Sequence, residues 1–340
     1  MFQSGSLYRH ESTNTPSFSG RTYANFELNF ATANINGTGG SALSINNLTT
    51  TSGALNLGMT GTPGHSIKGN VTVGSGSTLN FNPASAGTMT LNGSTQQVIS
   101  GAGTLTIGSN QTFVLDNANG LLLQRDVVFN GPQLTLTSGN ITTGVNTLTL
   151  APSTLSSGTG DVVGNTERNG PFVAGTIYSF GNSDVTLNFT DAPPSRIASI
   201  DALPTEVIVN LTSGTPAGFS NAVSRTYTIV ATGGSGYSAT VRLHYLDSEL
   251  NGNTEADLTL WRYDGSEWQS VGRTSIDTTN NWVELSGVTA FSPWALASNE
   301  PTAVTLRALT ARAPLTPLAA LPVAALALAG GVVVWRRRKA

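Results

Sequence analysis

The chain has 340 residues, and only 10% of them are Asp, Glu, Lys or Arg, against about 25% in an ordinary soluble domain. Its 16 basic and 19 acidic residues argue against a nucleic-acid-binding protein, which needs a basic surface to neutralise phosphates. With 39% hydrophobic residues and a weak net charge, the chain can bury a core and is not disordered. Because Cys is absent, disulfides, thiolate metal sites and cysteine nucleophiles are excluded.

The charges divide the chain into regions of different composition. Residues 1–160 carry eight charged side chains, residues 161–300 carry 21, and the six after Glu300 are all positive. The net charge is therefore −9 up to residue 300 and +6 beyond it. We accordingly expect a repeat region (1–160), a second module (161–300), a linker (301–314), a membrane helix (315–335) and a basic end (336–340).

Residues 1–160 contain short units in which apolar and polar residues alternate. Such alternation places Leu, Phe and Ile on one face of a strand and Thr or Asn on the other. The clearest units are GALNL, GSTLNF, GTLTI, GPQLTL and NTLTL, at residues 53–57, 76–81, 103–107, 131–136 and 146–150. These residues predict many short strands with a neutral polar outer face.

The spacing of these units favours a solenoid. Their leading leucines are Leu55, Leu79, Leu105 and Leu134, separated by 24, 26 and 29 residues. Irregular repeats of this length are typical of a parallel β-helix, in which one turn cannot bury its apolar face alone but stacked turns can. An antiparallel sandwich or meander would show the same alternation and is the alternative.

One phrase of the repeat region carries a family resemblance. Residues 134–150 read LTLTSGNITTGVNTLTL. This pattern resembles the sequences of secreted bacterial repeat proteins, including autotransporter passenger regions. The resemblance implies an exported, β-rich surface protein.

Residues 161–300 contain longer strand patterns and more aromatic residues. No helical period is present, so at least six strands favour an antiparallel β-sandwich. The strand patterns occupy residues 184–189, 206–211, 225–231, 239–245, 258–263 and 282–285. We expect the tryptophans of this region, Trp261, Trp268, Trp282 and Trp294, to pack in its core.

The second half of this region also resembles a known kind of module. Residues 235–297 include the phrases YSAT, DLTLWRY and FSPW, and they resemble a module often placed just before the anchor of bacterial surface proteins. The resemblance implies display at the cell surface and supplies no catalytic residues.

One acidic stretch, residues 247–257, alternates oxygen-bearing side chains as a calcium loop does. Measured against the EF-hand spacing, position 12 is Leu258 where a bidentate Glu is required. A solvated acidic turn is therefore favoured over a calcium site, and we otherwise expect no cofactor. The calcium candidates are Asp247, Glu249, Asn251 and Glu255.

Residues for catalysis are scarce. The three histidines, His10, His65 and His244, form no metal-binding pair in the sequence, and the GxSxG, GxGxxG and P-loop motifs are absent. Acid–base catalysis on polysaccharides requires paired carboxylates, but residues 1–160 offer only four acidic side chains. We therefore expect no enzymatic activity.

The C-terminal tail has the pattern of a membrane anchor. The 21 residues from Leu315 to Trp335 carry no charge and are followed at once by a basic cluster. This length crosses a hydrocarbon core of about 30 Å, and the positive-inside bias keeps the cluster cytoplasmic. The predicted anchor residues are thus Leu315, Trp335, Arg336, Arg337, Arg338 and Lys339.

This tail resembles the C-terminal sorting and anchoring tails of bacterial surface proteins. No LPxTG or PEP motif precedes the apolar segment, so a retained single-pass anchor is favoured over cleavage. Residues 1–10 lack the apolar core of a signal peptide, and we expect the true beginning to lie upstream of Met1.

The sequence leaves two functional hypotheses. The first is a non-enzymatic structural or adhesive protein on the extracytoplasmic face of the cell envelope, held by one membrane helix, with surface glycans or other surface proteins as partners. The second is a carbohydrate-binding or carbohydrate-active extracellular β-helix protein, in which Tyr and Trp between residues 237 and 294 stack on sugars.

Overall fold

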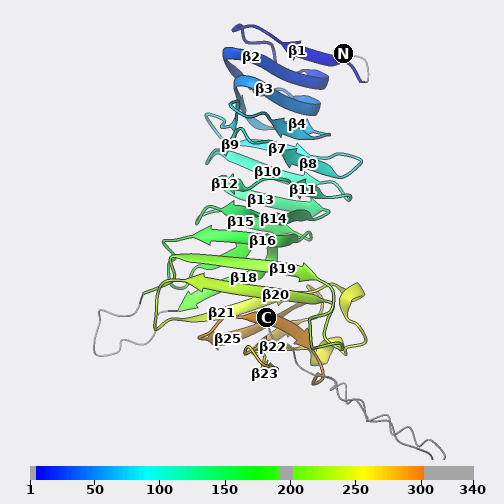
Figure 1. Cartoon of the computed structure of the whole chain (residues 1–340), viewed down its shortest axis with the longest axis vertical. Helices are drawn as coiled ribbons and strands as arrows, with labels where there is room; N and C mark the ends of the chain where they lie inside the picture. Colours follow the sequence, from blue (N-terminus) through cyan, green and yellow to red (C-terminus); the bar gives the residue numbers. More distant parts are fainter. Residues whose placement is uncertain (1–4, 191–201, 302–340) are drawn as a thin grey trace, which may run out of the picture. The chain divides into compact units, whose positions relative to one another are not determined.

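The structure is a computed structural model that describes residues 5–190 and 202–301, and its fold is all-β. A β-solenoid of about seven turns precedes two antiparallel arrays of strands (Figure 1). Figure 1 shows the strands of the solenoid stacked in chain order, from blue at the N-terminal end to green. The predicted solenoid is confirmed, and the antiparallel alternative for residues 43–150 is wrong because these strands pair in parallel.

Each turn of the solenoid contributes to three parallel ladders. The first ladder contains β4 (Gly61–Ile67), β7 (Gly87–Leu91), β10 (Gln111–Asp116), β13 (Gln133–Ser138) and β15 (Leu155–Gly158). The second contains β1 (Leu7–His10), β5 (Val71–Val73), β8 (Gln97–Ser100) and β11 (Leu121–Leu123), and the third β6 (Thr78–Phe81), β9 (Thr104–Ile107) and β12 (Val127–Phe129). Longer strands bend through several ladders: β2 (Thr22–Gly39), β3 (Ser44–Met59), β14 (Ile141–Leu150) and β16 (Val162–Asn169).

Inward positions of the third ladder form a continuous apolar row. Its members occupy equivalent positions in successive turns and are all buried: Leu57, Phe81, Ile107, Phe129 and Leu150. Outward positions carry amides and hydroxyls, and the Asn80 side chain donates to Asn56 Oδ1 at 2.6 Å. The alternation in the sequence therefore separates an apolar interior from a neutral polar exterior.

The spacing of the leading leucines was only partly informative. Leu55, Leu79 and Leu105 do stack in the third ladder, but Leu134 pairs with Phe113 in the first ladder. The interval of 29 residues therefore joins two different faces of the solenoid. All three strands of a turn share one apolar–polar pattern, so spacing alone did not reveal which ladder a leucine joins.

The last solenoid strand is shared with the following module. One edge of β16 pairs in parallel with β14, and its other edge pairs antiparallel with β19 (Glu206–Ser213). The antiparallel array then continues through β20 (Arg225–Thr232), β26 (Pro293–Ala297), β22 (Thr259–Tyr263) and β23 (Trp268–Gly272). The predicted border between residues 160 and 161 falls immediately before β16.

A second antiparallel sheet completes the module. It contains β17 (Ile177–Phe180), β18 (Asn182–Thr190), β21 (Ser238–His244), β25 (Trp282–Val288) and β24 (Ser275–Asp277), in that order. Residues of both arrays, among them Leu187, Val209 and Val241, share one hydrophobic core. The six strand patterns expected from the sequence appear as β18, β19, β20, β21, β22 and β25. Two short 3-10 helices, η1 (Asp247–Glu249) and η2 (Glu255–Asp257), lie between β21 and β22.

A buried arginine ends the apolar row of the solenoid. Arg168 pairs with Leu150 and so occupies the next inward position of the third ladder. Its guanidinium donates to the carbonyl oxygens of Ala151, Thr154 and Ser179 at 2.5, 2.7 and 2.8 Å. Burial lowers its pKa to about 10, so it remains cationic at neutral pH. A charged side chain thus occupies the position that follows Leu150 in the row, and the rings of Tyr178 and Phe180 lie 5.9 and 5.7 Å from its guanidinium carbon.

Candidate functional site

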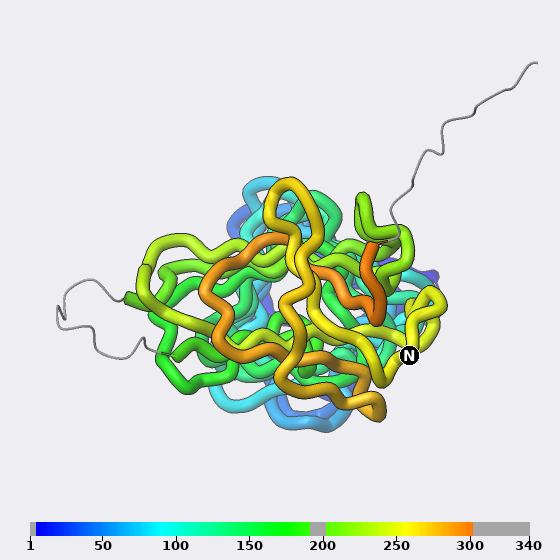
Figure 2. The backbone as a smooth tube through the Cα atoms, turned by 90° about the horizontal axis from the view of Figure 1, so that it is seen from below, coloured from blue at the N-terminus to red at the C-terminus, as the bar shows by residue number. Residues whose placement is uncertain are grey.

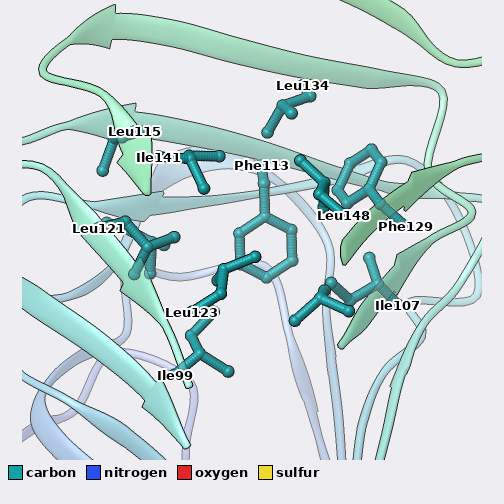
Figure 3. Close-up of a pocket in the computed structure, with 12 residues that line it drawn as sticks. Ile99, Ile107, Phe113, Leu115, Leu121, Leu123, Phe129, Leu134, Ile141 and Leu148 are labelled. Carbon is teal, nitrogen blue, oxygen red and sulfur yellow. The ribbon is translucent and has the colours of Figure 1, made fainter. Parts of the chain in front are cut away.

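The interior of the solenoid contains a small apolar cavity. Its volume is about 30 Å³, and Figure 3 shows Phe113 in the middle of the view among the other side chains that line the cavity. All twelve lining side chains are apolar, and a bound water needs two to four polar partners. This cavity is a packing space of the core and offers no group for binding or catalysis.

A larger pocket of about 460 Å³ lies beside the end of β16. Gly170, Pro171, Phe172, Leu203, Pro204 and Thr205 line it. None of these side chains is titratable, and the Thr205 hydroxyl already donates to the carbonyl oxygen of Thr232. Among the residues that the structure describes, the pocket therefore brings no titratable side chain to a ligand.

The main cluster of charged side chains lies where the solenoid meets the module. Arg225 Nη2 binds Asp161 Oδ2 at 2.9 Å, and its Nε binds Glu249 Oε2 at 2.7 Å. His244 Nδ1 lies 3.2 Å from Asp161 Oδ1, and the Asn182 side chain donates to the same carboxylate oxygen at 3.1 Å. We call these five residues the junction network.

Several elements supply the junction network. Asp161 directly precedes β16 at the corner of the last solenoid turn, whereas Arg225 begins β20 and His244 ends β21. Asp161 and Arg225 each expose only 3% of their side chains. Burial alone would raise the pKa of Asp161, but the hydrogen bond with His244 and the charge of Arg225 together outweigh it and hold that pKa below its ordinary value.

The junction network joins the end of the solenoid to strands of the module through ion pairs and hydrogen bonds. A His–Asp pair serves as a general base when a nucleophile lies within hydrogen-bond reach. In the described part of the chain, the ring of His244 bonds only to Asp161, Arg225 and Asn182. Tyr227 donates to the backbone oxygen of His244 and receives a bond from Arg225. These bonds satisfy buried charges and support a structural role.

The sequence analysis did not single out Arg225, Asp161 or Arg168. The only feature of the sequence that marked these three residues was their charge, because each lies at the edge of an apolar strand pattern in a chain with few charged residues. Partners such as Asp161 and Arg225 are 64 residues apart, and no local pattern shows that they meet. The structure thus supplied the pairing that makes these residues important.

The four calcium candidates do not converge on one point. The Asp247 carboxylate accepts from Asn281, Glu249 faces Arg225, and the Glu255 carboxylate accepts from Tyr245. The amide of Asn251 donates to the carbonyl oxygens of Ser220 and Ala222, both at 2.9 Å. Within residues 5–190 and 202–301, no group of three or more His, Cys, Asp or Glu is placed to hold a metal ion.

The tryptophans of the module are largely packed away. Trp261, Trp268 and Trp294 are buried, with Trp261 and Trp268 around Phe219 in a small separate cluster. Trp282 is partly exposed, but the Arg242 guanidinium covers its ring at 3.8 Å from the centroid. Arg242 itself is held by Asp184 and Glu284, at 3.3 and 2.9 Å. These rings therefore form no open platform for a sugar.

The other two histidines occupy separate places in the solenoid. His65 is fully buried, with Nδ1 accepting from the Leu43 amide and Nε2 bonded to the Thr60 carbonyl oxygen. His10 bonds to Tyr8 and Ser12 at the N-terminal end. The structure brings none of the three histidines together.

The predicted anchor belongs to the C-terminal part of the sequence. The apolar segment 315–335, the basic residues 336–339 and the linker up to residue 314, apart from Pro301, lie outside the described residues. In the ranges that are described, no helix is long and apolar enough to cross a membrane.

Comparison with protein-family models found no match for this chain, and neither did the searches of curated proteins and of solved structures. Function is therefore inferred from the chain's own residues.

Proposed function

We propose that the chain is a non-enzymatic structural or adhesive protein of the cell surface, in which the solenoid serves as a spacer and the tail as a single-pass membrane anchor. The observation that carries this proposal is the construction of the solenoid. Its interior is filled by apolar rows, outward positions such as Asn56 and Asn80 carry hydrogen-bonded amides, and its last strand is shared with the terminal module. Such a body suits the separation of two points better than the binding of a small molecule.

The distribution of charge supports the orientation. Up to residue 300 the net charge is −9, and the six charges that follow are all positive. Basic residues beside an apolar segment favour the cytoplasmic side, which puts the solenoid and module outside. The location is thus the extracytoplasmic face of the envelope, with residues 336–340 inside.

Protease treatment of intact producing cells tests this proposal. We expect added protease to remove epitopes inserted at Val145, which is 96% exposed, while an epitope after Ala340 stays protected. A matched variant ending at residue 314 should appear in the medium instead of the membrane fraction. Protection of the Val145 epitope, or membrane retention of the shortened chain, would contradict the proposal.

A carbohydrate ligand remains the competing hypothesis. The burial of Trp261, Trp268 and Trp294 lends it no support, because sugars stack on exposed ring faces. A glycan array probed with the full chain in detergent separates the two hypotheses. Glycan binding that is lost in the variant Trp282→Ala would support the carbohydrate hypothesis. The absence of binding to all bacterial and plant glycans on the array would contradict it.

A further inference from the structure

Asn–Gly pairs are the chemically labile points of this chain. The backbone nitrogen that follows an asparagine can attack the side-chain amide, and glycine hinders this attack least because it has no Cβ. The sequence contains six such pairs, which begin at Asn36, Asn92, Asn119, Asn130, Asn169 and Asn251. All six lie in the described part of the chain, so their surroundings can be compared.

The reaction is deamidation, and it needs no partner other than water. The glycine nitrogen forms a bond to the asparagine Cγ, the Cγ–Nδ2 bond breaks, and ammonia leaves with the proton of the glycine N–H. Water then opens the cyclic imide at either carbonyl carbon and gives aspartate or isoaspartate. A hydrogen bond that holds either reacting group must break first, and one such bond slows the reaction by about fivefold.

Five of the six pairs are restrained by a hydrogen bond of this kind. Asn36 Oδ1 accepts from Asn56, the Gly93 N–H donates to Gln97 Oε1, and the side-chain amides of Asn119, Asn169 and Asn251 donate to the Ser94 carbonyl, to Glu167 Oε1 and to the Ser220 and Ala222 carbonyls. The backbone nitrogens of Gly120 and Gly170 are bonded as well. Deamidation at these five pairs therefore requires a bond to open.

The pair Asn130–Gly131 differs from the other five. Asn130 is exposed at the end of β12, and within residues 5–190 and 202–301 neither its side-chain amide nor the Gly131 N–H forms a hydrogen bond. The turns on both sides pack closely against this corner. The Thr154 hydroxyl donates to the Gly131 carbonyl oxygen at 2.7 Å, and a Cβ on Gly131 would lie 1.8 Å from the backbone oxygen of Gln111. Figure 2 views this stack from the module end, with the green, cyan and blue turns one behind another.

We propose that Asn130–Gly131 is the site at which the folded chain first undergoes spontaneous deamidation. The reaction places a negative charge on the outside of the solenoid. Its isoaspartate product also adds one atom to the main chain, at a corner where the packing of the turns leaves no room for it. Modification of Asn130 is therefore expected to weaken the stacking of the turns around β12 and β13. The proposal does not depend on where the protein is located.

Peptide mapping by mass spectrometry tests the site. The full chain in detergent is incubated at mildly alkaline pH, and the modified fraction at each pair is followed over time. Asn92 is the matched control, because it is also exposed but the Gly93 N–H is bonded. We expect Asn130 to react at least about fivefold faster than Asn92, and all six pairs to react at similar rates in the chain unfolded by urea. Another pair that reacts as fast as Asn130 in the folded chain, or a preference for Asn130 that persists in urea, would overturn the proposal.

The effect on packing has its own test. After incubation, we expect the urea midpoint of the unchanged chain and of Asn92→Gln to fall, because Asn130 is modified in both. The variant Asn130→Gln should keep its midpoint, since glutamine would have to close a larger ring and reacts far more slowly. An equal fall in Asn130→Gln would place the damage elsewhere in the chain and contradict the proposed consequence.

Discussion

Two buried arginines show how single residues shape this protein. Arg168 forms no ion pair with a carboxylate of residues 5–190 or 202–301 and is held by backbone oxygens, next to Leu150 in a solenoid row. Arg225 is held by Asp161 and Glu249 and links the solenoid corner to the module. Buried charges are tolerated when they are hydrogen-bonded, and every guanidinium nitrogen of these two side chains has at least one acceptor.

The junction network predicts a dependence of stability on pH. The pKa of Asp161 is lower in the folded chain than its ordinary value, so its contribution is complete above the unfolded pKa of about 3.9. That contribution is lost as the pH falls through the lower, folded pKa. We therefore expect the melting temperature to hold near neutral pH and fall below about pH 4, as followed by circular dichroism.

The variant Asp161→Asn isolates this effect. It leaves Arg225 with less compensation, so we expect a loss of about 3 kcal/mol of unfolding free energy at pH 7 and a shallower decline in acid. Asp257→Asn, at an exposed site in η2, is the control and should change little. An acid profile of Asp161→Asn as steep as that of the unchanged chain would rule out this carboxylate as the cause.

At the scale of elements, stacking of the turns demands small residues at certain corners. Gly131 lies between β12 and β13, and a Cβ placed on it would lie 1.8 Å from the backbone oxygen of Gln111. Gly40 lies between β2 and β3, where the nearest atom to such a Cβ is Thr60 Oγ1 at 3.6 Å. Close approach of successive turns is therefore needed at the first corner and absent at the second.

These two glycines give a matched test of stacking. Gly131→Ala must push neighbouring backbone apart, so we expect it to lower the unfolding free energy by about 2 kcal/mol or more. Gly40→Ala should stay within about 0.5 kcal/mol of the unchanged chain. Urea unfolding measures both, and similar values for the two variants would mean that the turns move apart more easily than their packing indicates.

At the scale of the whole molecule, the solenoid and module share strand β16 and the junction network. Stacked repeats interact mainly with their neighbours and can lose cooperativity along an array. Here the described residues, 5–190 and 202–301, belong to one compact unit, and β16 pairs on both edges. These shared contacts favour unfolding of both parts in a single step.

Fluorescence and circular dichroism together test this coupling. Trp335 belongs to the tail, whereas Trp261, Trp268, Trp282 and Trp294 lie in the module. In a Trp335→Phe background, tryptophan fluorescence therefore reports the module, whereas far-ultraviolet dichroism reports the strands of both parts. We expect the two denaturation curves to coincide in the unchanged chain and to separate in Arg225→Met, with Arg262→Met as control. Curves that already differ in the unchanged chain would refute coupling through the junction.

The sequence by itself determined the all-β class and most strands of the module, and it favoured a solenoid over an antiparallel arrangement, which only the parallel pairing in the structure excluded. Alternation with period two is a local property, and any strand with one buried face must show it. The tertiary structure decided which ladder each strand joins, because Leu105 and Leu134 have the same local pattern but stack on different faces. It also decided that Asp161 forms an ion pair with Arg225 and that the Asn253 side chain accepts a hydrogen bond from the backbone of Ser298. Such contacts join residues far apart in the chain, and only packing of the whole molecule brings them together.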